Sequence, residues 1–316
     1  MSSACRPFHP RSDFADDLIP SVQALVVTQV RERVLGSSLS TFAIGGAVRA
    51  VVTVESVEEL SDVVSLLTKE GQEYRVIGNG SNVLFGDGSL PIWLLKLGAG
   101  FRRSESRARG ELEVFGAVPL MSFARQVSSE GLSGLEFAAG IPATIGGAVF
   151  MNAGAHGAEI CERIVQVRGV LSDGAIVTWR REELPWRYRH SGLPAGALVT
   201  SVVLALTEGD KEGISQVCAH NLAERRARQP LALPSAGSVF KNPSVERPAG
   251  MLLEGLGMKG FSIGGAVVSE VHANWIVNPR KQATASDVVS VIAACQERAR
   301  LHSGVELEPE VRLWLE

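Results

Sequence analysis

Apolar residues recur along this chain with two periods, one typical of half-buried strands and one typical of amphipathic helices. The clearest helix begins at a capping box formed by Ser56 and Glu59 and ends at Gly71. We expect further helices at residues 119–130, 214–228 and 286–302. We expect strands at residues 51–54, 74–77, 92–97, 111–116, 163–170, 175–180, 198–206, 275–278 and 305–315. This mixture of short strands and separate helices predicts an α+β fold.

Glycine-rich and polar stretches divide the chain into domains. Residues 131–157 are rich in Gly and Ala and show little periodicity, so we expect a long loop that wraps the second group of strands. A polar break, Glu-Gly-Asp-Lys, follows at residues 208–211. A chain of 316 residues also exceeds one ordinary core. We predict a partly helical N-terminal segment at residues 1–37, a module of two lobes at 38–208 that divides near residue 96, and a C-terminal α+β domain at 209–316.

Composition argues against several classes of function. The formal net charge is −3, so the chain lacks the basic field that holds nucleic acid. No apolar run reaches the roughly 18 residues that a membrane span needs, and the first residues show no secretory signal, so we expect a cytoplasmic protein without membrane insertion. The cysteines are far apart and form no metal-binding motif, so we expect free thiols and no metal site. These cysteines are Cys5, Cys161, Cys218 and Cys295.

Two glycine-rich loops are the first candidates for chemistry. The first glycine loop, Gly-Asn-Gly-Ser-Asn, spans residues 78–82, and the second, Gly-Ile-Pro-Ala-Thr-Ile-Gly-Gly-Ala, spans residues 140–148. Neither is a Rossmann motif or a P-loop. Both concentrate backbone N–H groups without side-chain bulk, as a pyrophosphate requires, although tight turns are the alternative. The candidate cofactor-binding residues are Gly78, Asn79, Gly80, Ser81, Asn82, Gly140, Ile141, Pro142, Thr144, Gly146, Gly147, Asn152 and Gly154.

Three further segments carry polar side chains in restricted settings. In Trp-Arg-Tyr-Arg-His-Ser at residues 186–191, an extended backbone would place two arginines on one face, where they suit a carboxylate. Residues 234–243 hold a serine, a lysine and an asparagine between two prolines, which favours a rigid loop. Alternation at residues 307–313 puts two glutamates and an arginine on one face. A solvated strand, an ordinary turn and an edge strand are the respective alternatives.

Taken in this order, the segments resemble the UDP-N-acetylenolpyruvoylglucosamine reductase family. The resemblance covers the chain from about residue 38 onward, at residues 41–46, 78–82, 140–148, 151–154, 188–191, 234–243, 269–274 and 307–311. The glycine loops also resemble flavin folds of the vanillyl-alcohol oxidase (PCMH) type. The short interval between Arg189 and Ser238 resembles the type II subfamily, which lacks an inserted loop whose tyrosine covers the substrate.

The resemblance implies a flavin-dependent oxidoreductase of peptidoglycan synthesis. FAD would be held noncovalently by the two lobes, and the C-terminal domain would close over a UDP-sugar. NADPH would be the co-substrate in the reduction of UDP-N-acetylenolpyruvoylglucosamine to UDP-N-acetylmuramate. The implied catalytic residues are Arg189, Ser238 and Glu310. The implied substrate-binding residues are Tyr188, Lys241 and Asn242.

Some positions depart from the family pattern. Ala143 stands where a glycine is common, His156 where a tyrosine is usual, and Ala47 where a proline is frequent. We expect altered packing around FAD and not its loss, and we expect a monomer. Two other functions stay open at this point. One is an FAD-dependent oxidase of an alcohol or sugar, and the other is a nonenzymatic flavin- or nucleotide-binding protein.

Overall fold

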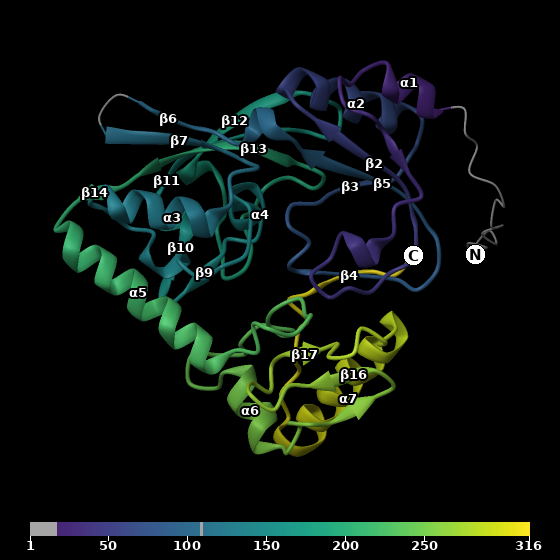
Figure 1. Cartoon of the computed structure of the whole chain (residues 1–316), viewed down its shortest axis with the longest axis vertical. Helices are drawn as coiled ribbons and strands as arrows, with labels where there is room; N and C mark the ends of the chain where they lie inside the picture. Colours follow the sequence, from purple (N-terminus) through teal and green to yellow (C-terminus); the bar gives the residue numbers. More distant parts are fainter. Residues whose placement is uncertain (1–17, 108–109) are drawn as a thin grey trace, which may run out of the picture.

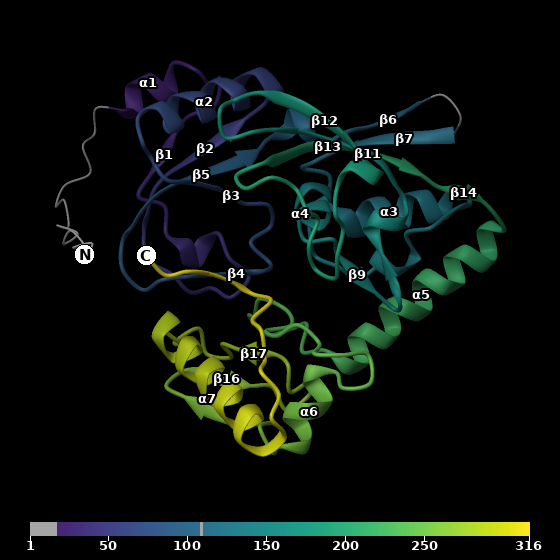
Figure 2. The same ribbon diagram turned by 180° about the vertical axis from the view of Figure 1, so that it is seen from behind.

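The computed structural model describes residues 18–107 and 110–316, which form two sheet-containing lobes and a C-terminal domain (Figure 1). The long helix α5 (Lys211–Arg228) runs along the outer edge of the second lobe and leads into the C-terminal domain, as the reverse view also shows (Figure 2). The predicted α+β class is therefore confirmed. The first 17 residues of the predicted N-terminal segment, Cys5 among them, lie outside the described residues.

The first lobe is built on a four-stranded sheet with the order β1-β2-β5-β3. Strands β2 and β3 run parallel to β5, and β1 is antiparallel to β2. Helix α2 presents Leu60, Val63 and Leu67 to the core of this lobe, where all three are fully buried. The elements are α1 (Ile19–Gln23), β1 (Arg31–Glu32), η2 (Gly36–Ser38), β2 (Val48–Val54), α2 (Val57–Lys69), β3 (Tyr74–Val76), β4 (Val83–Phe85), β5 (Leu90–Leu97) and η3 (Ala99–Phe101).

Local signals set the ends of α2. The hydroxyl of Ser56 accepts a hydrogen bond from the N–H of Glu59 at 3.1 Å, and Gly71 follows the helix with a φ of 61°. Only one of the two hydrogen bonds of the predicted capping box forms as expected. The Glu59 carboxylate accepts from the N–H of Glu55 at 2.8 Å, one residue before the predicted donor.

The second lobe is a five-stranded antiparallel sheet with the order β12-β11-β13-β7-β6. Its central strand β13 is buried along nearly its whole length, as expected where both faces of a strand are covered. Helices α3 and α4 pack on this lobe (Figure 1). The elements are β6 (Ser104–Ser106), β7 (Glu111–Phe115), α3 (Leu120–Ser129), β8 (Leu132–Ser133), η5 (Glu136–Ala138), α4 (Ile145–Phe150), β9 (Gly154–Ala155), β10 (Ala158–Glu159), η6 (Ile160–Glu162), β11 (Ile164–Val170), β12 (Ile176–Arg180), η7 (Arg181–Glu183), β13 (Leu198–Ala205) and β14 (Thr207–Glu208).

Helix α4 corrects the prediction of an unbroken loop at residues 131–157. Thr144 is its N-cap, with the hydroxyl accepting from the N–H of Gly147 at 3.2 Å. The glycines and alanines of this stretch hide the helical period, because they contribute little contrast between apolar and polar positions. A helix therefore begins inside the second glycine loop, and the N–H groups of Ile145 and Gly146 at its start donate to the carbonyls of Val118 and Gly116.

The C-terminal domain packs a three-stranded antiparallel sheet, β15-β16-β17, against helix α7. Thr284 caps the start of α7 and Gly304, with a φ of 65°, ends it. The strand predicted at residues 305–315 is shorter than expected. The chain around Pro309, which has no N–H to donate, forms no continuous ladder. The elements are α5, α6 (Ala249–Gly255), β15 (Ser262–Ile263), β16 (Ala266–Val268), β17 (Ile276–Val277), α7 (Ala285–Ser303) and β18 (Arg312–Trp314).

Several contacts tie the C-terminal domain to the N-terminal module. Strand β18 pairs in parallel with β4 of the first lobe, and Phe42 and Leu84 lie in the core of the C-terminal domain. Asp87 of the first lobe accepts hydrogen bonds from the N–H groups of Ala285 and Ser286 at the start of α7. Helix α5 also packs against α3 of the second lobe. The domain boundary at residue 209 stays a prediction.

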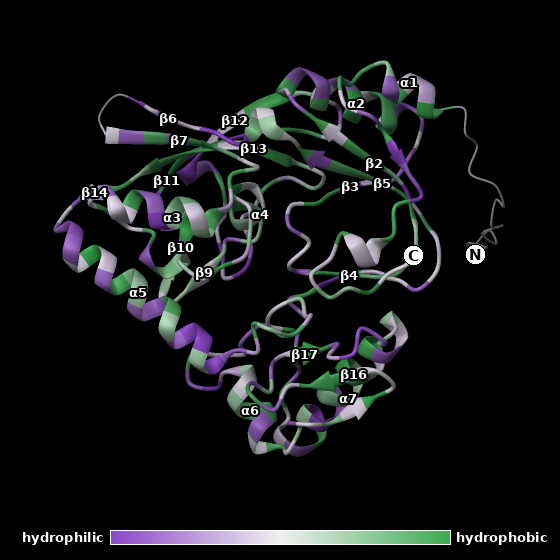
Figure 3. Ribbon diagram, in the orientation of Figure 1, coloured by the Kyte–Doolittle hydropathy of each residue, from purple (hydrophilic) through white to green (hydrophobic). Residues whose placement is uncertain are grey.

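Hydropathy follows this packing. The central strands β2, β5 and β13 are largely hydrophobic, whereas α5 alternates hydrophilic and hydrophobic segments (Figure 3). In the described part of the chain, no helix combines the length and the apolarity needed to cross a membrane.

Cys161, Cys218 and Cys295 are buried free thiols, as predicted.

Candidate active site

A cavity of about 960 Å³ has a lining drawn from both lobes and the C-terminal domain. The predicted site residues in its lining are Gly78, Asn79, Gly80, Ser81, Asn82, Gly140, Ile141, Pro142, Thr144, Gly147, Gly154, Tyr188, Arg189, Ser238, Asn242 and Glu310. A neighbouring cavity of about 330 Å³ includes Gly146 and shares Gly78 and Thr144 with the first. Both glycine loops and the three predicted catalytic residues therefore meet in one place.

The glycine loops approach each other and their neighbours too closely for larger residues. A Cβ atom at Gly78 would lie 2.6 Å from the Thr144 hydroxyl of the second loop. A Cβ atom at Gly140 would lie 2.5 Å from Cδ of Arg225. The amide of Asn79 donates a hydrogen bond to the carbonyl of Pro142 at 3.1 Å and so links the two loops directly.

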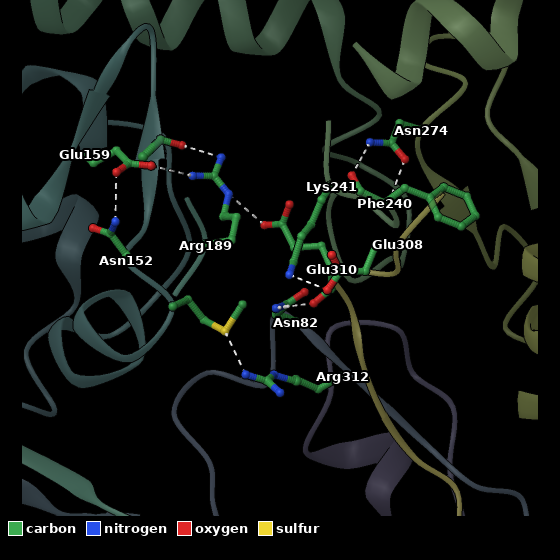
Figure 4. Close-up of polar contacts among 12 residues, drawn as sticks. Asn82, Asn152, Glu159, Arg189, Phe240, Lys241, Asn274, Glu308, Glu310 and Arg312 are labelled. Carbon is green, nitrogen blue, oxygen red and sulfur yellow. Dashed lines mark hydrogen bonds and ion pairs between the residues drawn. The ribbon is translucent and has the colours of Figure 1, made fainter. Parts of the chain in front are cut away.

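Arg189 and Glu310 form an ion pair across the cavity between the second lobe and the C-terminal segment (Figure 4). Nε of Arg189 lies 3.0 Å from Oε1 of Glu310, and both side chains are 17% exposed. Arg189 also donates from Nη2 to the carbonyl of Gly154 at 2.9 Å, and its guanidinium lies 4.6 Å from the ring centre of Tyr188. A guanidinium held in this way can bind a substrate carboxylate.

Glu310 is a carboxyl group with altered acidity. Burial raises the pKa of Glu310, and the positive charges of Arg189 and Lys241 oppose this shift only in part. The protonated form is therefore favoured to a higher pH than in an ordinary glutamate. A neutral carboxyl group can donate a hydrogen bond, which an ionised one cannot.

Ser238 lies in a loop held in place by backbone contacts. Gly237 before it has a φ of 77°, a left-handed conformation that favours glycine. Asn274 then bonds Phe240 twice: its Oδ1 accepts from the Phe240 N–H at 2.9 Å, and its Nδ2 donates to the Phe240 carbonyl at 2.8 Å. The N–H of Glu310 donates to the carbonyl of Val239 at 2.7 Å. The segments carrying Ser238 and Glu310 are thus joined.

Comparison with known proteins identifies this arrangement. Residues 229–314 match the C-terminal domain of UDP-N-acetylenolpyruvoylglucosamine reductase, and residues 32–180 match the FAD binding domain. The reductase of Halalkalibacterium halodurans is 39% identical over 300 residues, which span 94% of this chain and 98% of that protein. This chain belongs to the UDP-N-acetylenolpyruvoylglucosamine reductase family.

Two other members of this family extend the agreement. The reductase of Heliobacterium modesticaldum is 44% identical over 278 residues, covering 87% of each chain. The crystal structure of the Thermus caldophilus reductase superimposes with a TM-score of 0.78 at 36% identity, over 90% of this chain and 98% of that one. The two-lobed FAD-binding module and the C-terminal domain are thus those of the reductase family.

The residues around the cavities fit the FAD of this family. Nε of Arg225 is buried and has no hydrogen-bond partner among the described residues, and burial lowers the pKa of Arg225 to about 10. A buried cation beside the bare backbone of Gly140 fits a pyrophosphate. The smaller cavity adds the apolar surface of Leu97, Ala117 and Trp314, which suits a flat ring. The glycine loops and Arg225 would hold FAD here.

Three predicted residues have contacts that point elsewhere. Asn152 is fully buried outside the lining of both cavities, and its amide donates to the Glu159 carboxylate at 2.8 Å. Lys241 also lies outside the lining and pairs with Glu308 at 2.5 Å. Asn242 is in the lining, but its Oδ1 accepts from the N–H of Ala249 at the start of α6. Direct substrate or cofactor contact by these side chains stays a prediction.

Sequence reasoning missed three residues of this reductase site. Arg225 has no distinguishing sequence signal, because the basic end of α5 gives no sign of its burial. Asn274 lay in a matching segment without an assigned role. Glu159 lies in none of the matching segments, although its Oε1 is 3.9 Å from Nη1 of Arg189.

Proposed function

We propose that this protein reduces the enolpyruvyl ether of UDP-N-acetylenolpyruvoylglucosamine to a lactyl ether and so forms UDP-N-acetylmuramate for peptidoglycan. The observation that supports this most strongly is the grouping of Arg189, Ser238 and Glu310 in the cavity that both glycine loops line. The reaction adds one hydride and one proton across a carbon–carbon double bond, while NADPH becomes NADP⁺. Bound FAD supplies the redox chemistry by accepting hydride from NADPH and delivering hydride to the substrate.

Arg189 would stabilise the charge that develops on the substrate. Hydride addition at the terminal carbon pushes negative charge into the adjoining carboxylate and gives an enediolate-like species. A fixed guanidinium that is largely shielded from water stabilises such charge without reorganising. The contacts of Arg189 with Glu310 and Gly154 hold it ready for this role.

Glu310 would act on the same intermediate in its protonated form. Its raised pKa favours a carboxyl group that donates a hydrogen bond to the enediolate oxygen. Its backbone bond to Val239 keeps this group beside the serine loop.

Ser238 would complete the reaction as the general acid. Serine is a weak acid, but the carbanion-like intermediate is a strong base, so transfer of the hydroxyl proton to the carbon next to the carboxylate is favourable. The left-handed Gly237 and the Asn274 contacts fix the loop that presents the hydroxyl.

The alternative is an FAD-dependent oxidase of an alcohol or sugar. Such an enzyme needs no largely shielded arginine–glutamate pair for an enediolate and no serine proton donor, so the grouping of these three residues favours the reductase. The test is to incubate the purified protein with NADPH and UDP-N-acetylenolpyruvoylglucosamine and to measure the product by mass spectrometry. A gain of two hydrogens is expected. Oxygen consumption with an alcohol or sugar, without this product, would support the oxidase.

The cellular setting is part of the proposal. A nucleotide sugar and NADPH are cytoplasmic metabolites, which favours a cytoplasmic enzyme. We also propose a monomer, as expected from the family resemblance. Analytical ultracentrifugation of the FAD-loaded protein would test this, with a single species of 33.6 kDa expected for the chain.

A further inference from the structure

Arg189 has a backbone conformation that needs support. Its φ is 55°, in the left-handed region where residues with a side chain are uncommon. It lies in a turn closed by two hydrogen bonds between Arg187 and His190, each 2.9 Å long. Such a conformation persists only where surrounding contacts stabilise it. The contacts that hold this turn therefore also determine where the guanidinium points.

The short hairpin β9–β10 contacts Arg189 through one pair of partnered residues. Gly154 and Glu159 face each other in the hairpin register. The Gly154 carbonyl accepts from Nη2 of Arg189 at 2.9 Å, and Oε1 of Glu159 lies 3.9 Å from Nη1. A Cβ atom at Gly154 would lie only 2.9 Å from Cγ of Glu159. The glycine thus leaves the space that the Glu159 side chain occupies.

A fully buried amide fixes the Glu159 carboxylate. Nδ2 of Asn152 donates to Oε2 of Glu159 at 2.8 Å (Figure 4) and to the carbonyl of Arg187 at 3.0 Å. Oδ1 of Asn152 accepts from the N–H of Cys161 at 3.3 Å. One side chain therefore ties the Glu159 carboxylate to the turn that carries Arg189.

We propose that Glu159 is a positioning residue that orients Arg189 and shares the charge of Arg189 with Glu310, an inference that rests on the reduction proposed above. Nε of Arg189 faces Glu310 while Nη1 faces Glu159, so the guanidinium lies between two carboxyl groups. When Glu310 carries a proton, Glu159 keeps the cation paired. Glu310 can then donate a hydrogen bond without leaving an unpaired charge in a water-poor site.

This arrangement has a consequence for pH dependence. Without the Glu159 charge, Arg189 acts on Glu310 alone and favours the ionised form of Glu310. The decline of substrate reduction at alkaline pH would then begin at lower pH. The other ionisable groups around these residues are Lys241, Tyr188, Cys161, Arg181 and Glu162.

The test uses Glu159→Gln in the FAD-loaded enzyme. Glutamine keeps an oxygen for the Asn152 amide and removes only the charge. In stopped-flow measurements, flavin reduction by NADPH should match the wild type, while substrate reduction should slow on the order of tenfold through misplacement of Arg189. The alkaline limb of substrate reduction should move down by about one pH unit. Isothermal titration calorimetry with the UDP-sugar, in the absence of NADPH so that no turnover occurs, should show weaker binding by this variant.

Two further variants separate charge from structure. Glu162→Gln is the matched control, since Oε1 of Glu162 accepts from the Glu159 N–H at 3.0 Å in the same turn, and wild-type rates and pH limb are expected. Glu159→Asp keeps the charge, so its rate should fall while its pH limb stays in place. An unmoved limb with Glu159→Gln, or equal slowing of both half-reactions, would overturn the inference. Failure of the wild-type protein to reduce the substrate would contradict the proposed function instead.

Discussion

The side-chain amide of Asn82, in the first glycine loop, donates a hydrogen bond to the main-chain carbonyl of Glu310 at 3.2 Å (Figure 4). The carbonyl of Asn82 in turn accepts from the N–H of Arg312 at 3.0 Å. One residue of the first glycine loop therefore holds the main chain on both sides of Val311. The position of Glu310 depends on the first glycine loop as well as on the C-terminal domain.

Asn82→Ala should impair substrate reduction more than FAD binding. Loss of one such hydrogen bond costs about 1 kcal/mol, and displacement of Glu310 would add to the effect on the substrate step. Asn79→Ala is the matched control, because Asn79 bonds Pro142 of the second loop instead. It should weaken FAD binding and leave the substrate step of the loaded enzyme intact. Fluorescence titration with FAD and stopped-flow absorbance measure the two effects. The same pattern in both variants would contradict this division of roles.

Replacing Arg189 or Glu310 should slow substrate reduction while flavin reduction by NADPH stays largely intact. Arg189→Ala removes a preorganised charge, which typically costs about 10²–10³-fold. Because burial raises the pKa of Glu310, wild-type substrate reduction should persist above the ordinary carboxyl range and decline as Glu310 ionises. Glu310→Gln cannot ionise, so its slower rate should lose this alkaline decline. A Glu310→Gln variant impaired only in flavin reduction would refute the assigned role.

Ser238→Ala should bind FAD and substrate, accept hydride from NADPH and stall in the second half-reaction. Loss of a positioned general acid costs roughly 10²–10⁴-fold. Ser238→Cys, which retains a proton to donate, should recover part of the rate. In deuterated water the new deuterium should appear on the carbon next to the carboxylate and not on the methyl group, as NMR of the product would show. Near-normal turnover by Ser238→Ala would remove Ser238 from the mechanism.

Asp87→Ala should destabilise the contact between the first lobe and α7 by about 1 kcal/mol, as typical for loss of a helix cap. Partial burial raises the pKa of Asp87, but hydrogen bonds from Ala285 and Ser286 outweigh it, so the net pKa is lowered. The ionised cap therefore contributes its full stability above the unfolded pKa of this carboxyl group, and the contribution is lost as pH falls through the folded pKa. Urea unfolding at several pH values should show less acid sensitivity for Asp87→Ala. An unchanged acid dependence would rule out this contribution.

The purified protein should be yellow and should release intact FAD on acid precipitation. His156, the departure from the family tyrosine, lies outside the lining of both cavities and faces Glu224 at 3.4 Å, so it is not placed to bond a flavin. Arg225→Ala should weaken FAD binding about 10- to 100-fold, as expected for loss of a charge-assisted hydrogen bond. Arg228→Ala, on the exposed side of α5, is the control. Flavin that stays on the precipitated chain would contradict noncovalent binding.

The sequence predicted the elements whose signals are local. Ser56 and Gly71 mark the ends of α2 through their own conformations and hydrogen bonds. Helix α4 escaped prediction because glycine and alanine carry little periodic contrast. Pairing of β4 with β18 also escaped, since three-residue strands from distant parts of the chain carry no local signal of their partnership.

Prediction of the candidate site from the sequence was limited in the same way as prediction of the fold, because only local signals are visible. Family motifs brought Arg189, Ser238 and Glu310 into one hypothesis, and the structure gathers them in one cavity. Residues whose importance comes from burial were missed or assigned differently. Arg225 reads as one of several arginines at a helix end. Asn152 reads as a cofactor-binding residue, although its buried amide bonds Glu159 and Arg187. Burial and hydrogen-bond partners depend on tertiary packing, which single-sequence patterns do not record.

Because β18, near the end of the chain, pairs with β4 of the first lobe, the C-terminal domain is attached to the N-terminal module at two points. One attachment is through α5 and the other is through β18. A region on a single linker can unfold locally while the rest of a protein stays native. Here, release of the domain would break the β4–β18 pairing, expose Phe42 and Leu84, and detach Asn82 from Glu310. Unfolding of the C-terminal domain and disordering of the first glycine loop should therefore occur as one cooperative event, with hydrogen exchange at both reporting a shared opening free energy.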